Sequence, residues 1–154
     1  MALLLVVNLR GKINSSQGVR RALSEMRVER KFTATVVTDE PSTLGMLKSC
    51  KDFIAWTPID GELLSSLLEK RGMLTESKRL DGPALSKLGF GKHSEVAEMM
   101  IKEQKRLASV RGIRPFFRLS PPRGGFKSSL RRQATERGTL GANPGLTDIV
   151  RRMI

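Results

Sequence analysis

The stretch that decides the fold is ALLLVVNL at residues 2–9. A short, nearly continuous apolar run that includes β-branched residues predicts a strand that is buried on both faces or that starts a core. Arg10-Gly11-Lys12 ends the run, and Asn14, Ser15 or Ser16 can cap the following element. That element has apolar residues at the spacing of one helical face, namely Val19, Ala22, Leu23 and Met26. It is therefore expected to be an amphipathic helix that packs on a sheet.

The next fifty residues repeat this alternation of strand and helix. Residues 32–38 (FTATVVT) alternate with the period of a strand, residues 43–50 predict a short helix, and residues 53–56 (FIAW) predict a third strand. A β-α-β-α-β order within 58 residues indicates a two-layer α/β sandwich with helices on one face of a small sheet.

The second half of the chain is expected to elaborate this core. Asp60 is a candidate N-cap for a helix with one leucine stripe, residues 94–107 predict another helix, and Ile113–Leu119 resembles a returning strand. The glycines of GTLGANPG (138–145) are expected in an extended loop, and Pro144 fits the first turn of a last helix. The expected parts are a core at 1–58, a helical elaboration with a return strand on the same domain at 59–119, an extended Arg/Gly/Pro-rich arm at 120–143, and a C-terminal helix at 144–154.

The positive charge is concentrated near the C-terminus. The chain holds 28 Lys and Arg against 15 Asp and Glu, a net charge of +13, and its pI is about 10.9. From Arg111 onward there are ten cations against only Glu136 and Asp148, which is +8 of that total. Nine of the ten are arginine, whose planar fork holds phosphate with two hydrogen bonds and stacks on bases. This balance indicates a polyanionic partner, and RNA fits it best.

Residues 113–132, IRPFFRLSPPRGGFKSSLRR, carry most of that charge. The segment has too little apolar surface to fold alone, so it is expected to be extended or disordered until an anion holds it. A merely solvating basic tail would explain neither the arginine bias nor the interleaved Pro, Gly and Phe. A membrane-surface role is disfavoured because Pro121-Pro122 and Gly124-Gly125 prevent a helical apolar face. Truncation before Pro121 is expected to leave the core folded and to remove most of the RNA affinity.

Few residues of the sequence favour an enzymatic function. Gly91-Lys92 lacks the upstream glycine and the following Ser or Thr of a phosphate loop, and His93 is more typical of a surface or capping residue. Cys50 is the single cysteine, so there is no intrachain disulfide, and one Cys with one His offers no metal site. No cofactor is expected. The apolar start is too short for a signal peptide and no run is long enough to span a membrane, so a cytoplasmic protein is expected.

Several stretches together resemble a known family. They are Arg10-Gly11, the helix of 20–26, Pro41-Ser42-Thr43-Leu44-Gly45-Met46, Lys51-Asp52-Phe53-Ile54-Ala55-Trp56, Lys70-Arg71-Gly72, Phe117-Arg118-Leu119, Pro121-Pro122-Arg123, Gly125-Phe126-Lys127-Ser128 and Arg152-Met153-Ile154. In this order they resemble the universal large-subunit ribosomal protein numbered thirty, called number seven in eukaryotes, in its longer archaeal form. One departure is Leu44, where the family usually has arginine.

The resemblance implies an α+β fold of truncated ferredoxin-like type, with a small antiparallel sheet backed by helices. It also implies a structural role on large-subunit ribosomal RNA beside neighbouring ribosomal proteins. It implies no small-molecule substrate, no membrane and no homo-oligomer. Phosphate contacts are expected from the extension, with Gly124 and Gly125 for close backbone approach and Phe126 for stacking or wedging. The predicted RNA-binding residues are Arg10, Lys12, Arg20, Arg21, Arg114, Arg118, Arg123, Gly124, Gly125, Phe126, Lys127, Arg131, Arg132 and Arg137. Two alternatives stay open: a free RNA-binding or RNA-chaperone protein, and, less favoured, an enzyme acting on RNA.

Overall fold

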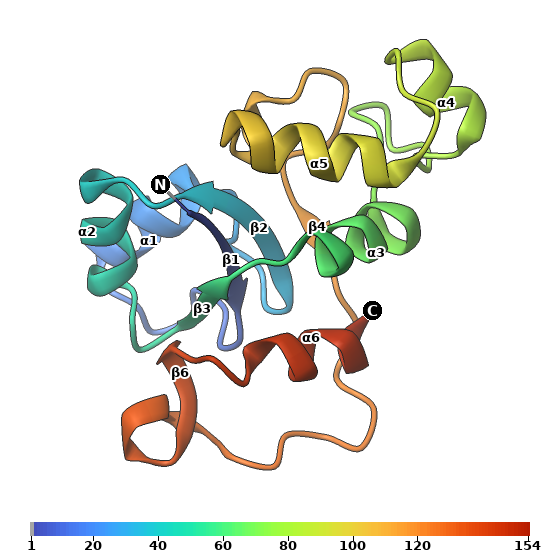
Figure 1. Ribbon diagram of the computed structural model, residues 1–154. Helices are drawn as coiled ribbons and strands as arrows, with labels where there is room; N and C mark the ends of the chain where they lie inside the picture. Colours follow the sequence, from blue (N-terminus) through green and yellow to red (C-terminus); the bar gives the residue numbers. More distant parts are fainter. Residues whose placement is uncertain (1) are drawn as a thin grey trace.

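Strand β1 (Leu3–Asn8) lies inside the sheet of the computed structural model, which describes residues 2–154 (Figure 1). All six of its residues are buried, and it pairs antiparallel with β2 (Thr33–Thr38) on one side and β3 (Ile54–Pro58) on the other. The strand order is β4-β2-β1-β3-β6-β5, where β4 is Phe117–Arg118, β5 is Ser129–Gln133 and β6 is Gly138–Ala142. The apolar run at residues 2–9 is thus the central strand that its composition predicts.

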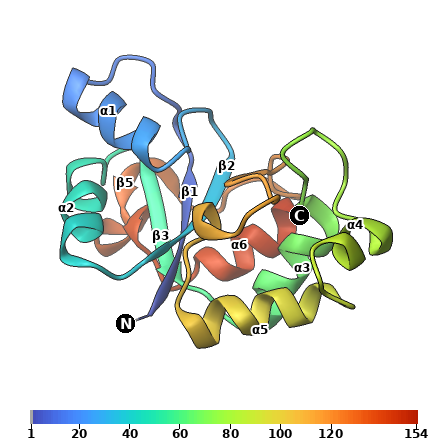
Figure 2. The ribbon, with the colours of Figure 1, turned by 90° about the horizontal axis from the view of Figure 1, so that it is seen from above.

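Helices α1 (Gln17–Glu25) and α2 (Pro41–Ser49) cover one face of this sheet (Figures 1 and 2). Alternate residues of β1, Leu4 and Val6, belong to the same buried cluster as Leu23 of α1 and Leu47 of α2. The side chain of Ser16 accepts a hydrogen bond from the Val19 amide and so caps α1, as the sequence predicts. The expected β-α-β-α-β order of the first 58 residues is confirmed.

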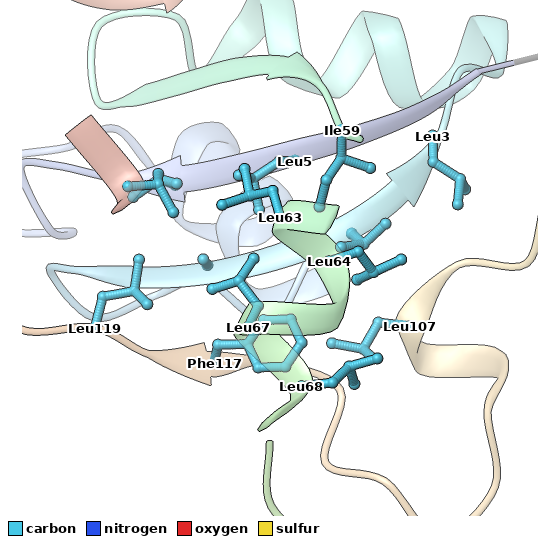
Figure 3. Packing of buried hydrophobic residues seen from close by; sticks show 14 of the residues in the cluster. Leu3, Leu5, Ile59, Leu63, Leu64, Leu67, Leu68, Leu107, Phe117 and Leu119 are labelled. Carbon is cyan, nitrogen blue, oxygen red and sulfur yellow. The ribbon is translucent and has the colours of Figure 1, made fainter. Parts of the chain in front are cut away.

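The opposite face of the sheet is covered by helices from the second half of the chain. They are α3 (Gly61–Arg71), α5 (His93–Glu103) and α6 (Leu146–Met153), while α4 (Gly82–Lys87) lies beyond them. Leu5 of β1 packs in a cluster with the leucines of α3 and with Phe117 (Figure 3). The α+β class is confirmed, but helices on one face describe only the first 58 residues. The physical reason is that β1 is apolar on both faces and needs cover on both.

The C-terminal segment completes the sheet on its β3 side. β6 pairs parallel with β3, and β5 pairs parallel with β6. The expectation of a loop over the glycines of 138–142 is therefore wrong, because these residues cover the open edge of β3 and bury Leu140. A Cβ at Gly138 would collide with the Arg132 carbonyl group, and one at Gly141 would collide with the Gln133 side chain. These glycines permit close backbone approach within a strand.

Candidate nucleic-acid interface

The strand directions bring one end of every strand to the same side of the molecule. β1 and β4 run in one direction, and β2, β3, β5 and β6 run in the other. The carboxyl ends of β1 and β4 therefore lie on the same side of the molecule as the amino ends of β2, β3, β5 and β6. Each of the six ends carries or adjoins a cation: Arg10 and Lys12 at β1, Arg30 and Lys31 at β2, Lys51 at β3, Arg118 at β4, Lys127 at β5 and Arg137 at β6. We call this side the basic end.

The opposite side of the sheet carries acidic residues. Asp39 and Glu40 follow β2, and Asp60 and Glu62 follow β3. The connections at residues 39–41, 59–62 and 143–145 contain no Lys or Arg, although the segment before β4 holds Arg111 and Arg114. A six-residue strand is about 20 Å long, which is roughly twice the Debye length at physiological ionic strength. A polyanion near the basic end is therefore screened from these acidic groups.

Buried Asn8 shapes the loop that leaves β1. Its Nδ2 donates to the Val28 carbonyl oxygen at 2.6 Å, and its Oδ1 accepts from the amides of Arg10 at 3.1 Å and Gly11 at 2.7 Å. The loop turns at Gly11, whose φ is +78°. The Arg10 guanidinium lies 5.3 Å from the centre of the Phe53 ring and donates to the Asp52 carbonyl oxygen. Arg10 is thereby held in place while its side chain remains exposed.

The other predicted cations around the start of α1 have partners within the protein. Lys12 forms an ion pair with Glu29 at 2.8 Å, and Arg21 forms one with Glu25 at 3.3 Å. The hydrogen bond from Lys12 is the largest cause that holds the pKa of Glu29 below its usual value, with a further contribution from Ser24. Arg20 donates to the Ser15 hydroxyl at 3.4 Å. All of these pairs lie at the surface, where phosphate can compete for the cation because exposed ion pairs are weak.

At the β4 edge of the sheet, arginines gather around an aromatic ring. The guanidinium carbons of Arg114 and Arg118 lie 5.4 Å and 6.0 Å from the centre of the half-buried Phe116 ring. Arg114 also donates to the Ser77 hydroxyl. Phe117 is fully buried, so one of the two phenylalanines is core, as expected. The ring of Phe116 borders an open pocket of about 650 Å³, which we call the β4 pocket.

The arm that follows β4 is held by the last helix of the protein. In Figure 1 it passes below the sheet as the orange segment. The Arg123 amide donates to the Arg152 carbonyl oxygen, and the Arg152 guanidinium donates to the carbonyl oxygens of Arg123 and Gly125 at 3.1 Å and 2.8 Å. The arm therefore has contacts within the protein, in addition to the anion that the sequence predicts as its partner. α6 thus bonds backbone groups of Ser120, Arg123 and Gly125, while the side chains of Arg123 and Lys127 remain exposed.

The remaining predicted contacts of the arm divide into two groups. Gly124 and Gly125 adopt φ values of +79° and +72° and leave the backbone open, as a close phosphate contact requires. Phe126 instead faces the protein, because its ring lies 6.1 Å from that of Phe32 at an angle of 22°. Its partly buried ring belongs to the packing around the core. That Phe126 stacks on RNA stays a prediction.

Arg131, Arg132 and Arg137 lie at the far edge of the sheet from the β4 pocket. Arg131 and Arg132 are exposed on β5, the last strand on that side, and Arg137 is exposed in the turn before β6. Five inter-strand spacings separate β4 from β5, or roughly 24 Å at about 4.8 Å each. The predicted residues are thus not one compact cluster. Those beside the strand ends and on the arm form a band across the basic end, whereas Arg114 lies in the segment before β4, and Arg20 and Arg21 lie on α1.

Four residues that build this interface are not among the predicted RNA-binding residues. Asn8 and Arg152 hold the β1–α1 loop and the arm through hydrogen bonds to backbone groups, whereas Arg27 and Arg30 line the β4 pocket. Arg27 and Arg30 have a local signal, since both lie in the short polar turn between α1 and β2. Arg152 has none, because the arm carbonyls that it binds lie 27 and 29 residues away. Asn8 has a local signal in its bonds to the amides of Arg10 and Gly11, but its bond to the Val28 carbonyl oxygen spans 20 residues.

Other features of the described residues give no sign of chemistry. Burial raises the pKa of the Cys50 thiol, which favours the unreactive protonated form. His93 is hydrogen-bonded to the Leu80 carbonyl oxygen at 2.7 Å. Across residues 2–154, no three His, Cys, Asp or Glu side chains are grouped as a metal site would require. Within the same range, no helix has the length and apolar character needed to cross a membrane.

Comparison with known proteins gives consistent matches. A family model described as ribosomal protein L30p/L7e matches residues 4–54. The chain is 38% identical over 156 residues to the large ribosomal subunit protein uL30 of Thermofilum pendens, with all of both chains covered. It is 36% identical to the protein of that name in Korarchaeum cryptofilum, covering 99% of this chain and 95% of the relative. With that of Nitrosopumilus maritimus the identity is 32%, covering 97% of each.

Proposed function

The chain belongs to the uL30 family of large ribosomal subunit proteins, and on that premise we propose that it binds the ribosomal RNA of that subunit through its basic end and arm. As a family member it is a structural component of the subunit and not an enzyme, which places it in the cytoplasm. The subunit supplies its two kinds of partner, ribosomal RNA and neighbouring ribosomal proteins.

The observation that carries this proposal is the segregation of charge along the strands. A cation lies at each strand's end on one side, and four acidic residues follow β2 and β3 on the other. Glu29, Asp52 and Glu136 also lie at the basic end, but the cations there outnumber them. A band of exposed arginines binds backbone phosphates favourably, because each contact releases condensed counterions from the RNA.

The arm adds a second argument. Hydrogen bonds from Arg152 order its backbone before any RNA is present, so less conformational entropy is lost when RNA binds. The cations of the arm then bind phosphates from a backbone that is already held in position by α6. Phosphate contacts of this kind position a protein on RNA without selecting a sequence.

The test is sedimentation of the tagged chain from a cell lysate through a density gradient, before and after a high-salt wash. We expect the chain to stay with the large subunit after the wash. Recovery only at the top of the gradient, with free RNA, would instead favour a free RNA-binding protein or RNA chaperone.

A pair of double variants makes this test specific for the basic end. Arg123→Glu with Arg132→Glu reverses two exposed charges on the arm and on β5. Lys87→Glu with Lys102→Glu changes the charge equally on α4 and α5. We expect only the first pair to lower retention after the wash. Equal loss from both pairs would mean that net charge, and not the basic end, holds the chain on the subunit.

A further inference from the structure

The β4 pocket contains groups that RNA-backbone binding alone does not require. Its lining includes the half-buried Phe116, the cations Arg27, Arg30 and Arg118, and the carboxylates Glu25 and Glu29. The volume of about 650 Å³ falls within the usual range for small-ligand sites, roughly 300 to 1,000 Å³. Carboxylates repel phosphate, so a surface built only for the RNA backbone would not place two of them here.

Arg27 occupies a backbone position that favours glycine. The amide of Arg27 donates to the Ser24 carbonyl oxygen and that of Val28 to the Leu23 carbonyl oxygen, which is the pairing of a Schellman end to α1. Arg27 has a φ of +61°. The Cβ of an L-residue crowds the following carbonyl oxygen in this conformation, which is therefore unfavourable for arginine. The backbone of Arg27 is therefore strained, and its guanidinium lines the pocket. Strain of this kind points to a functional side chain.

Together these groups match the chemistry of one unstacked nucleotide. An aromatic ring or a guanidinium plane stacks on a base, and unpaired bases are what proteins recognise most often in RNA. The pocket contains an aromatic ring in Phe116 and a guanidinium in Arg118. The guanidinium carbon of Arg118 lies 6.0 Å from the centre of the Phe116 ring. Arg27 and Arg30 would hold the flanking phosphates.

The carboxylates would contact the edge of that base. Oε1 of Glu25 accepts from Arg21, and Oε2 of Glu29 accepts from Lys12. An ionised carboxylate has about four acceptor positions, so both groups retain acceptor capacity. They suit the exocyclic amino group of adenine, cytosine or guanine, whereas uracil has no such group.

We propose that the β4 pocket seats one unpaired, amino-bearing nucleotide of RNA, stacked against Phe116 and Arg118. This inference rests on the proposed function and names the RNA element recognised at one edge of the basic end.

Base-reactivity mapping tests the proposal. Large subunits would be purified from cells in which a variant is the only copy of the chain, then treated with dimethyl sulfate and kethoxal. Base stacking on an aromatic ring is worth enough that its loss should raise reactivity at one unpaired A, C or G about tenfold in Phe116→Leu subunits. Phe116→Tyr, which keeps the ring, should retain protection. Arg27→Gly should raise the reactivity of the same nucleotide while the isolated protein unfolds at the same or a higher temperature.

A crosslink separates this inference from the proposed function. Benzoylphenylalanine would replace Phe116 in one chain and Lys127 in another, and assembled subunits would be irradiated. A crosslink from position 116 to a single unpaired A, C or G supports the proposal. A crosslink to a protein, to uridine or to paired RNA overturns it, as does an unchanged reactivity pattern in Phe116→Leu subunits. Failure of RNA crosslinks at both positions would overturn the proposed function as well.

Discussion

At the residue scale, single buried or strained side chains set the shape of the interface. Asn8 is the clearest case, because it is fully buried and forms hydrogen bonds to three backbone groups. It is the last residue of β1, directly before the loop that carries Arg10. No buried side-chain nitrogen or oxygen among the described residues lacks a hydrogen-bond partner. Loss of such a side chain leaves the backbone groups that it bonded without a hydrogen-bond partner.

We expect Asn8→Ala to destabilise the isolated protein by about 3 kcal/mol. The reason is that the buried Gly11 amide and the Val28 carbonyl oxygen lose their partner, at roughly 1 to 3 kcal/mol for each unsatisfied group. Urea unfolding followed by circular dichroism measures the change. Gln17→Ala, at an exposed position in the first turn of α1, is the control and should stay within about 0.5 kcal/mol of the parent. A similar effect from both variants would contradict the structural role of Asn8.

The Lys12–Glu29 pair predicts a titration. Since the pKa of Glu29 is lowered in the folded protein, its stabilising contribution is present above the unfolded pKa, near 4.5, and is lost as pH falls through the lower folded value. A carboxyl-detected NMR titration should place the pKa of Glu29 below 4.5 in the parent and return it toward 4.5 in Lys12→Met. An unchanged pKa in that variant would show that Lys12 is not its cause.

At the element scale, the last helix links the core to the RNA-facing arm. One face of α6 buries Leu146, Val150 and Met153 against the sheet, while Arg152 donates to two carbonyl groups of the arm. The same helix therefore closes the core and orders the arm. For this reason truncation before Pro121 should not leave the core folded, contrary to the sequence-based expectation. It would remove β5, β6 and α6, including the buried Leu140.

We expect Arg152→Ala to loosen the arm without unfolding the protein. Hydrogen exchange at the amides of Arg123 and Gly125 should accelerate about tenfold, since two charge-assisted hydrogen bonds at a partly exposed site are lost. Exchange in β1 should stay unchanged. Arg151→Ala is the matched control, because Arg151 is an exposed arginine on the same helix. Equal acceleration in both variants would mean that charge alone orders the arm.

At the scale of the whole molecule, the interface is a band that crosses the basic end from β4 to β5. The predicted cations of the extension lie at both edges of the sheet and on the arm between them. A partner must therefore span roughly 24 Å to reach both edges. A folded RNA does so, whereas a single nucleotide reaches only one pocket.

The salt dependence of RNA binding should reflect this extent. If Arg114, Arg118, Arg123, Lys127, Arg131 and Arg132 neutralise six phosphates, log K should fall with log salt at a slope of roughly −4 to −5. Filter binding of the full chain to large-subunit ribosomal RNA fragments measures the slope. Replacing Arg131 and Arg132 by Gln should make it shallower by about 1.4 to 1.8, and a slope near zero in the parent would contradict the electrostatic account.

The sequence by itself determined the order of the core elements, the central strand and the concentration of arginine toward the C-terminus. These properties follow from local periodicity and composition, which any short window of the chain carries. Only the tertiary structure decided that residues 138–142 extend the sheet, that α6 holds the arm, and that Arg27 and Phe116 border one pocket. Each of these depends on partners distant in sequence, as when Thr33 pairs with Arg118. Such pairing depends on edges and faces that exist only once the sheet has formed.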